Sequence, residues 1–432
     1  MTNKKLLVVG GGAAGFFCAV NAARLNPDLK IIIVEKTSKL LSKVKVSGGG
    51  RCNLTHACFD IAEMSKQYPR GSNFIKKTFH QFFTTDTIQW FEERGVKLKT
   101  ENDGRMFPVT DSSQTIVDCL MKEVNKYGIE IRLNTEVKDI SHASPLLASG
   151  QALTPHESRF KIQTNRGNIE SDFICIACGG YPKSFMFDWL RKLGHSTQDP
   201  VPSLFTFNMP GNPIVKLMGV SVERARIKIV GSKLQQEAPL LITHWGLSGP
   251  AVLRLSAWGA RELATCNWQF TIVVNWVPAY NEQSLKEKFQ QLRFDLASKK
   301  IGFKNSFGLP QRLWEFLIEQ SGVNTGIRWA DLLAKDQNML IKNLCAWESS
   351  VKGKTTFKEE FVTAGGVQLN EVDANSMMSK KITNLFFAGE ILDVDGITGG
   401  FNFQHAWTSG WIAARNIAQV SKEGLANSTI TQ

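Results

Sequence analysis

The stretch KLLVVGGGAAG at residues 5–15 decides the fold that this sequence predicts. An apolar run meets the pattern G-x-G-x-x-G, formed by Gly10, Gly12 and Gly15, and a helical segment and a second apolar strand, Lys30–Val34, follow. This strand–helix–strand order is the parallel unit of a doubly wound sheet. In such a unit the first glycine permits the tight turn, the second admits a pyrophosphate, and the third lets the helix pack closely on the sheet.

Glu35 lies 20 residues after Gly15, at the end of the second predicted strand. A carboxylate at this place accepts hydrogen bonds from a ribose diol and opposes a 2′-phosphate, which favours FAD or NAD over NADP. The N–H groups and the positive dipole at the start of the helix, near Ala13 and Ala14, suit a pyrophosphate. The stretch therefore predicts a dinucleotide site; a merely glycine-rich turn is the alternative.

A second glycine run, SGGGRCN at residues 47–53, follows closely. Three consecutive glycines lose much conformational entropy on folding, so they indicate a backbone that must approach a ligand. Arg51 and the nearby Lys43 carry charges that suit a phosphate or a substrate anion. A flexible surface loop is the alternative interpretation.

The sequence FAGEILDVDGITGGFNFQHA at residues 387–406 is the third signal. It leads into a predicted helix from Asn402 to Ala418, whose small residues allow close packing against a sheet or a cofactor. The N–H groups at Phe401–Phe403 precede the hydrogen-bond ladder of this helix. If they face an isoalloxazine ring, they stabilise the negative charge of reduced flavin. A glycine-rich helix cap without a ligand is the alternative.

The composition, with 43% hydrophobic and 21% charged residues among 432, is that of a soluble globular protein of two or three domains. Scattered basic residues give a net charge of +12, which indicates a generally basic surface. The apolar run at residues 6–23 contains four glycines and no cleavage site, so we interpret it as a strand and turn rather than a secretion signal. A membrane span is not predicted, and we expect a cytoplasmic protein.

The texture of the sequence changes along the chain. Strands alternate with helices at first, short β-like segments broken by Gly and Pro follow, and the α/β texture returns near the C-terminus. Ile169–Ile176 is predicted as one strand, and Ser141–Ser158 as a loop insertion. The predicted segments are residues 1–199 (nucleotide domain, first part), 200–280 (β-barrel insertion), 281–346 (helical insertion), 347–361 (return to the barrel) and 362–432 (nucleotide domain, second part).

The eight cysteines are too few and too irregularly spaced for a disulfide scaffold, and no spacing predicts a metal site. Cys175 and Cys178 match C-x-x-C inside a predicted strand, where alternation would point nearby thiols to different faces. Cys52 and Cys58 form C-x5-C near the place where flavin disulfide reductases keep a C-x4-C pair. They support a disulfide reductase as an alternative function.

These motifs together resemble the BaiN/YhiN-type flavoproteins, also called aminoacetone-oxidase-like FAD-binding enzymes. The resemblance rests on the N-terminal fingerprint, the SGGGRCN run, GRMFP at residues 104–108 and the C-terminal motif. THWGLSGP at residues 243–250 and VTAGGV at residues 362–367 also match, and the resemblance extends from about residue 4 to 418.

The resemblance implies an α/β fold with a Rossmann-like, glutathione-reductase-type FAD-binding domain built from both chain ends. A β-barrel subdomain and a small helical subdomain interrupt it. The resemblance, together with the glycine motifs, predicts non-covalent FAD contacts at Gly10, Gly12, Ala13, Ala14, Gly15, Glu35, Lys36, Lys43, Ser47, Gly48, Gly49, Arg51, Cys52, Asn53, Val137, Ala177, Gly179, Gly389, Glu390, Gly400, Phe401 and Asn402.

The catalytic acid or base is not fixed by the sequence, which offers three candidates. His244, in THWGLSGP, is a candidate proton donor or substrate contact, with a structural turn as the alternative. His405 lies one turn inside the C-terminal helix, near the expected ring, with a packing role as the alternative; Arg51 is the third candidate. Six tryptophans of the insertion are expected in its core: Trp245, Trp258, Trp276, Trp314, Trp329 and Trp347.

The sequence therefore predicts an FAD-dependent oxidoreductase that passes a hydride or two electrons between an organic substrate or NAD(P)H and an acceptor. One G-x-G-x-x-G has the right context, so NAD(P)H would dock transiently as a co-substrate. The alternatives are the disulfide reductase, an RNA-binding flavoprotein motivated by the net charge, and a flavin-binding protein without turnover. We expect a small-molecule substrate and neither a membrane nor a nucleic-acid partner. The substrate, the electron acceptor and the oligomeric state are not determined by the sequence.

Overall fold

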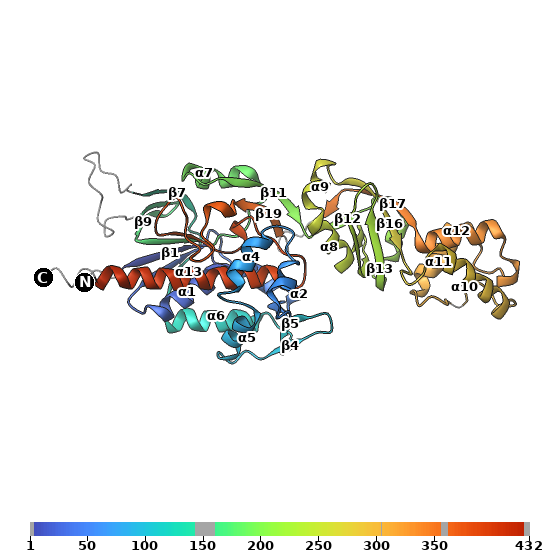
Figure 1. Cartoon of the computed structure of the whole chain (residues 1–432), viewed down its shortest axis with the longest axis horizontal. Helices are drawn as coiled ribbons and strands as arrows, with labels where there is room; N and C mark the ends of the chain where they lie inside the picture. Colours follow the sequence, from blue (N-terminus) through green and yellow to red (C-terminus); the bar gives the residue numbers. More distant parts are fainter. Residues whose placement is uncertain (1–3, 143–159, 304, 356–361, 427–432) are drawn as a thin grey trace. The chain divides into compact units, whose positions relative to one another are not determined.

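The computed structural model describes residues 4–142, 160–303, 305–355 and 362–426. The chain divides into two compact units (Figure 1). The first unit consists of Met1–Pro202 and Lys358–Gln432, and the second of Ser203–Phe357. The predicted loop insertion falls mostly on residues 143–158, outside the described residues.

A five-stranded parallel sheet forms the centre of the first unit, in the order β20-β10-β1-β2-β6. Its inner strands are short runs of Val, Ile, Leu and Phe that are buried on both faces, as parallel strands covered by helices are. Its strands are β1 (Lys5–Val9), β2 (Lys30–Val34), β6 (Glu130–Arg132), β10 (Phe173–Ile176) and β20 (Leu385–Phe387).

Two helices from opposite ends of the chain, α1 (Ala13–Leu25) and α13 (Phe401–Ala426), pack against each other beside this sheet (Figure 1). The predicted C-terminal helix is confirmed and extends beyond Ala418. A Cβ added at Gly410 would lie 2.7 Å from the carbonyl oxygen of Ala14, so only glycine permits this approach.

The remaining elements of the first unit surround the central sheet. Its further strands are β3 (Thr55–His56), β4 (Leu98–Thr100), β5 (Arg105–Pro108), β7 (Val137–His142), β8 (Phe160–Thr164), β9 (Gly167–Ser171), β11 (Thr197–Ser203) and β19 (Val362–Val367). Its further helices are α2 (Ser42–Gly50), α3 (Ile61–Ser65), α4 (Ser72–Phe79), α5 (Thr84–Glu92), α6 (Gln114–Lys126) and α7 (Asp188–Lys192), with 3-10 turns η1 (Ser184–Phe187), η4 (Leu369–Glu371) and η5 (Gly389–Ile391).

The prediction of one strand over Ile169–Ile176 is wrong, because Asp172 interrupts the strand and separates β9 from β10. The Asp172 carboxylate accepts a hydrogen bond from Lys5 N at 2.7 Å, and Asp172 N donates to Lys5 O at 3.0 Å. These two bonds redirect the chain from the three-stranded β7-β8-β9 sheet into the central parallel sheet.

The second unit is built on a seven-stranded antiparallel sheet in the order β17-β16-β13-β14-β15-β12-β18. The two edge strands are consecutive in sequence and separated by Gly353 alone, so the sheet must curl until its edges meet, as in a barrel. The α/β class and the antiparallel insertion are therefore confirmed. Its strands are β12 (Thr206–Asn208), β13 (Ser221–Ile229), β14 (Gln235–Ile242), β15 (Gly246–Ser248), β16 (Gln269–Asn275), β17 (Trp347–Lys352) and β18 (Lys354–Thr355).

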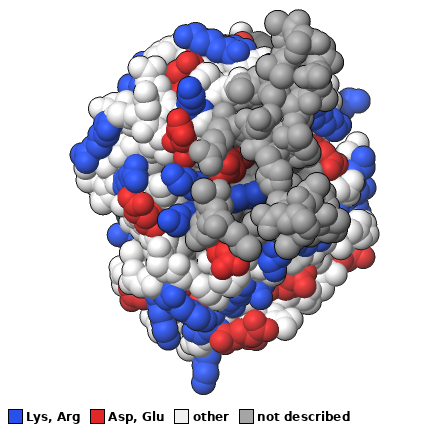
Figure 2. All heavy atoms as spheres, turned by 90° about the vertical axis from the view of Figure 1, so that its left-hand side faces the viewer, with Lys and Arg blue, Asp and Glu red and all other residues white. Residues whose placement is uncertain are grey.

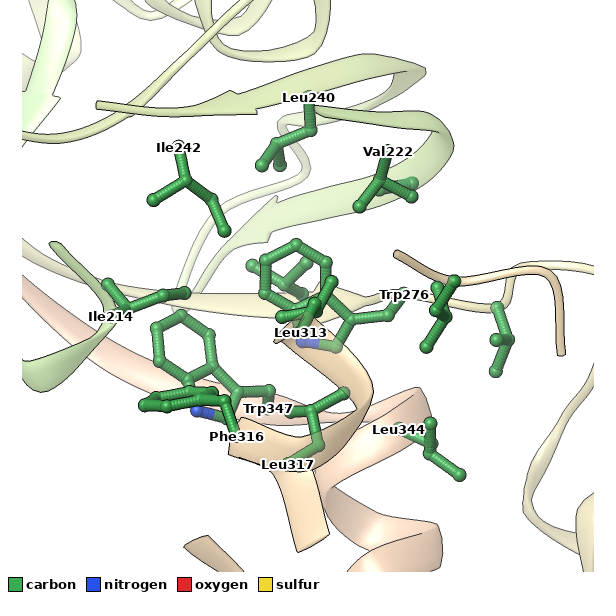
Figure 3. Packing of buried hydrophobic residues seen from close by; sticks show 14 of the residues in the cluster. Ile214, Val222, Leu240, Ile242, Trp276, Leu313, Phe316, Leu317, Leu344 and Trp347 are labelled. Carbon is green, nitrogen blue, oxygen red and sulfur yellow. The ribbon is translucent and has the colours of Figure 1, made fainter. Parts of the chain in front are cut away.

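Helices complete the core of this unit. Figure 3 shows Leu240 and Ile242 of the sheet on one side and Phe316 and Leu317 of α11 on the other. The boundary between barrel and helical insertion stays a prediction. The helices are α8 (Pro250–Trp258), α9 (Ala260–Thr265), α10 (Glu282–Asp295), α11 (Gln311–Gln320) and α12 (Ala334–Cys345), with 3-10 turns η2 (Pro213–Leu217) and η3 (Trp329–Asp331).

The tryptophan prediction is correct for four of the six. Trp245 and Trp258 are the exceptions, with exposed fractions of 42% and 40%. The former lies in the turn between β14 and β15 and the latter ends α8, so each lies where its element meets solvent. The four buried tryptophans are Trp276, Trp314, Trp329 and Trp347.

A buried network of hydrogen-bonded side chains, centred on His195, stabilises the first unit. His195 accepts or donates at both ring nitrogens, Nδ1 to Glu371 Oε2 and Nε2 to Ser379 Oγ, each at 3.2 Å. Burial would raise the pKa of Glu371, but hydrogen bonds from Lys381, Ser196 and His195 outweigh it and lower that pKa to about 2. Burial lowers the pKa of His195, despite the neighbouring carboxylate.

We expect His195→Ala to lower the free energy of unfolding by about 2–3 kcal/mol, because Glu371 and Ser379 would lose a buried partner. Both Glu371 and His195 have lowered pKa values, so the unfolded state binds more protons and stability should fall from pH 7 toward pH 4. Between pH 7 and 5, the unfolding free energy of the variant should therefore change less steeply with pH than that of the wild type. Urea unfolding at several pH values measures the loss of stability and its pH dependence, with the exposed His80→Ala as control. If His195→Ala and the wild type show the same pH dependence, His195 does not contribute to it.

Candidate functional site

The carboxyl ends of four parallel strands meet at one edge of the central sheet. Gly10 follows β1, Glu35 follows β2, Ala177 follows β10 and Gly389 follows β20 by one residue. Ligands of doubly wound sheets bind outside this edge. The fold thus brings together predicted residues that are up to 379 positions apart in sequence.

The first glycine turn leaves open space where a pyrophosphate would lie. Gly10 has φ +116°, and a Cβ there would lie 2.4 Å from Ala177 O; a Cβ at Gly15 would lie 2.1 Å from Gly10 O. At Gly12, by contrast, an added Cβ would meet no atom within 4 Å. Gly12 also begins α1 without a side-chain cap. The open space in front of an uncapped helix N-terminus fits a dinucleotide phosphate.

Glu35 has a structural task beside the predicted ribose contact. Its Oε2 accepts a hydrogen bond from Gly11 N, and its Oε1 accepts from Thr37 N, each at 2.9 Å. The carboxylate therefore holds the glycine turn in shape. It is only partly buried, so lone pairs remain for a ligand hydroxyl.

The second glycine run is not a flexible loop but the kinked end of α2. Gly48, Gly49 and Gly50 all have positive φ, and Cβ atoms at Gly49 and Gly50 would meet almost nothing within 4 Å. Ser113 fixes the run from outside, with its N donating to Gly50 O at 2.8 Å. The result is an ordered backbone with one open side, which fits the predicted close approach of a ligand.

Arg51 is already paired with two carboxylates. Its Nη1 lies 2.5 Å from Glu101 and 3.6 Å from Asp111, and its guanidinium lies 4.0 Å above the Phe107 ring. The hydrogen bond to Glu101 raises the pKa of Arg51. A substrate anion would therefore compete with these partners. Arg51 also contacts the glycine run, because its Nε donates to Gly48 O at 3.3 Å.

The start of α13 is fixed by contacts from distant segments. Asn402 bonds Gly396 through both its amide oxygen and nitrogen, each at 2.8 Å, and Tyr68 Oη donates to Phe401 O at 2.6 Å. Arg70 pairs bidentately with the fully buried Asp395. The loop before α13 is thereby held so that the N–H groups of its first turn have fixed positions.

Two further contacts join the chain ends at this edge. Lys43 Nζ lies 2.5 Å from Glu390 Oε2, while Glu390 Oε1 accepts a hydrogen bond from Thr363 N at 2.9 Å. The Asn53 amide spans Thr55 O at 3.1 Å and Gly400 N at 3.0 Å. Both contacts connect segments more than 340 residues apart.

His405 lies inside the protein, with 2% of its surface exposed. Its Nε2 is 3.3 Å from Gly389 O, and among the described residues Nδ1 has no partner. Burial lowers the pKa of His405 to about 4, so the ring is neutral at pH 7. Donation from Nε2 to a carbonyl leaves Nδ1 as a buried acceptor, which a bound group or water would be expected to satisfy.

Three other predicted residues have different surroundings. Val137 begins β7 and pairs with Thr164 of β8. A Cβ at Gly179, which has φ +75°, would meet no atom within 4 Å, so this glycine also borders open space. His244 belongs to the second unit, where it is exposed and its ring lies 4.2 Å from that of Trp245. The predicted roles of these residues stay predictions.

The disulfide-reductase alternative is not supported. All eight cysteines are free thiols. Cys52 is completely buried, and burial raises its pKa to about 12; burial also raises the pKa of Cys58. Because the thiolate is the reactive form, this pair lacks the activated thiol that disulfide exchange requires.

Sequence reasoning missed several residues that shape the site. Tyr68 and Arg70 act through Phe401 and Asp395, more than 320 residues away in sequence. Phe107 and Thr363 contact Arg51 and Glu390, which are nearer along the chain. No motif marks Tyr68 and Arg70, and the segment around them is polar. Phe107 and Thr363 belong to GRMFP and VTAGGV, motifs that carry the family resemblance but give these two residues no role.

The parallel sheet, the open glycine turn and the two helix N-termini define a Rossmann-type flavoprotein, an FAD-dependent oxidoreductase. The chain belongs to the HI0933-like protein family, whose Rossmann-domain model matches residues 4–416. The residues described above fit the cofactor: Gly12, Gly49 and Gly179 leave space for it, and the starts of α1 and α13 offer N–H groups.

Three relatives are similar to the chain over nearly its whole length. A ribosomal RNA dihydrouridine synthase of Escherichia coli K12 is 29% identical over 95% of this chain and 97% of its own. A protein of the same name from Haemophilus influenzae is 28% identical, covering 96% and 98%. A 3-dehydro-bile acid delta(4,6)-reductase of Clostridium scindens is 26% identical, covering 95% and 98%.

Among solved structures, the 3-ketosteroid delta1-dehydrogenase of Sterolibacterium denitrificans matches with a TM-score of 0.51 and 11% identity, covering 97% of this chain and all of that one. At this identity the likeness shows the fold alone. In the part of the chain that the structure describes, no helix combines the length and apolarity of a bilayer span. The same residues contain no cluster of His, Cys, Asp and Glu side chains arranged for a metal ion.

Gly12→Asp separates cofactor binding from folding. Asp is a good N-cap, and the space around Gly12 accepts its Cβ, so the stability of the apoprotein should be unchanged or raised by up to about 1 kcal/mol. The added negative charge facing the pyrophosphate should weaken FAD binding by roughly 100-fold, and Gly12→Ala should weaken it less. Flavin fluorescence titration and urea unfolding measure the two effects. Retained FAD affinity in Gly12→Asp would place the pyrophosphate elsewhere.

Proposed function

We propose that this protein reduces a carbon–carbon double bond conjugated to a carbonyl, and that its substrate is a uracil base of ribosomal RNA. The observation that carries the proposal is the full-length similarity to two relatives named ribosomal RNA dihydrouridine synthase. The relative named as a bile acid reductase supports the reaction class. Its name describes a 3-ketone with delta(4,6) double bonds, and uracil has a C5=C6 bond conjugated to its C4 carbonyl.

The reaction balances with NAD(P)H as the donor. A hydride from NAD(P)H reaches C6 of uracil, a proton from solvent reaches C5, and the C5=C6 double bond becomes single while NAD(P)H is oxidised to NAD(P)⁺. Bound FAD supplies the relay for this hydride. The sequence contains one glycine fingerprint in the right context, which we assign to FAD. NAD(P)H would therefore have no dinucleotide site of its own and would dock transiently.

The residues of the first unit prepare the site for this chemistry. The start of α1 near Gly12 would hold the pyrophosphate. The start of α13, fixed by Tyr68 and by the Arg70–Asp395 pair, would place N–H groups where negative charge develops on reduction. Neutral His405 adds no positive charge there at pH 7.

A small-molecule enone reductase is the second candidate. The similarity to the Clostridium scindens reductase, 26% over 95% of this chain, favours it. In that case the net charge of +12 would serve solubility rather than substrate binding.

The test offers both substrates to the purified holoprotein under anaerobic conditions. One arm holds ribosomal RNA from cells that lack this gene, and the other a 3-keto-4-ene steroid acid, each with NADH or NADPH. We expect nucleoside mass spectrometry to find uridine converted to a product 2 Da heavier, in an amount equal to the nucleotide oxidised. Reduction of the steroid alone would establish the second candidate, and reduction of neither would overturn the proposal.

A matched variant ties the product to the bound cofactor. Gly12→Asp should lower the bound flavin and the dihydrouridine in the same proportion, whereas the exposed His80→Ala should leave both unchanged. Dihydrouridine formed by a flavin-free Gly12→Asp preparation would contradict a flavin-dependent reduction.

A further inference from the structure

The excess positive charge of the protein is concentrated in the second unit. Residues 203–357 contain 19 Lys and Arg against 11 Asp and Glu, a net charge of +8 in 155 residues. The other 277 residues carry 32 basic against 28 acidic residues, a net charge of only +4. The face of the molecule in Figure 2 agrees with a near balance, because Lys and Arg are interspersed with Asp and Glu across it.

Within the second unit, three segments that hydrogen bonds join carry four basic residues and one aromatic residue, a region that we call the basic corner: Lys216, Lys299, Lys300, Phe303 and Arg312. All five residues are exposed, and Phe303 has an exposed fraction of 79%. None of the four basic side chains pairs with a carboxylate of the described residues. Nearby acids have other partners, since Asp331 pairs with Arg328 and Glu315 accepts from Gln311.

A series of hydrogen bonds links the members of the basic corner. Gln311 Nε2 donates to Gly302 O at 2.7 Å, which places the start of α11 against the segment that follows Lys300. Arg312 Nη2 donates to Lys216 O, also at 2.7 Å, which joins α11 to η2. The corner therefore spans three segments of one folded unit.

The segment that carries Lys299, Lys300 and Phe303 is ordered. Ile301 is completely buried, and its carbonyl oxygen accepts a hydrogen bond from Trp314 Nε1 at 3.0 Å. Its N–H donates to Ile327 O at 2.8 Å. With Ile301 anchored in the core, the two lysines and the phenylalanine are held on the solvent side.

The chemistry of this surface fits a polyanion that also presents flat bases. Unpaired Lys and Arg neutralise phosphates, and an exposed aromatic ring stacks on an unpaired base. An acidic protein segment would engage mainly the charges of this region, whereas a single-stranded or looped RNA engages both the charges and the ring. We infer that the basic corner binds the sugar–phosphate backbone of the RNA substrate, with Phe303 stacking on a base; this rests on the proposed function.

The test compares two variants of equal charge change in the full-length holoprotein. Lys299→Gln/Lys300→Gln removes two charges of the corner, and Lys335→Gln/Lys342→Gln removes two exposed charges of α12 in the same unit. The probe is a fluorescently labelled 30-nucleotide RNA hairpin with a uridine-containing loop, titrated at several salt concentrations.

We expect the corner variant to bind the hairpin roughly 10-fold more weakly, with a slope of log K against log salt smaller by about 1.5. Phe303→Ala should weaken binding with little change in that slope, because stacking releases no counterions. The α12 variant should have a smaller effect on affinity than the corner variant. FAD content and NAD(P)H oxidation with a mononucleotide substrate should be the same in all variants.

The outcomes separate this inference from the proposed function. If the wild type forms dihydrouridine in ribosomal RNA and the corner and α12 variants bind the hairpin equally, the inference is overturned and the proposed function stands. If the wild type forms no dihydrouridine but the corner variant alone loses hairpin binding, the proposed function fails and the surface remains an RNA-binding one. A wild type that does not bind the hairpin overturns the inference.

Discussion

The close packing of backbone at the end of β1 is the constraint on which the rest of the first unit depends. A Cβ at Gly10 would lie 2.4 Å from Ala177 O, and one at Gly15 would lie 2.1 Å from Gly10 O, so α1 can begin where it does only without these side chains. The turn is then held by Glu35, whose carboxylate accepts a hydrogen bond from Gly11 N. Gly12, which is free of such contacts, is left facing open space at the start of a helix, and this is the place where an anion is bound most favourably.

The second half of the site is assembled by polar contacts between the two chain ends. Asp395 is completely buried and paired with Arg70, and removing one partner of such a pair generally costs about 3–5 kcal/mol because a buried charge is left alone. The Lys43–Glu390 pair is more exposed and contributes less to stability, but it fixes the position of α2 against η5. These contacts place the start of α13 before any ligand arrives, and a preorganised group of N–H donors costs no reorganisation during reaction.

The two units differ in net charge and in the side chains that they expose to solvent. The first is nearly balanced in charge and contains the glycine turns, whereas the second carries most of the net charge and has ordered basic and aromatic side chains in solvent. In our proposal, the first unit holds the cofactor and the second holds the backbone of the RNA substrate.

The sequence by itself determined the nucleotide-binding fold and the class of cofactor, because G-x-G-x-x-G, the strand before it and Glu35 act within 30 residues and each has a local physical requirement. It also indicated the start of α13 and the antiparallel insertion from their patterns. It failed at Asp172, where two hydrogen bonds to Lys5 interrupt the strand predicted over Ile169–Ile176, and at Trp245 and Trp258, whose exposure depends on where their elements end. Only the tertiary structure decided that Arg51 is neutralised by Glu101, that His405 is buried and neutral, and that the segment after Lys300 lies against the start of α11, whose Arg312 bonds the Lys216 carbonyl. Each of these depends on neighbours brought together by folding, and spacing along the chain carries no information about such neighbours.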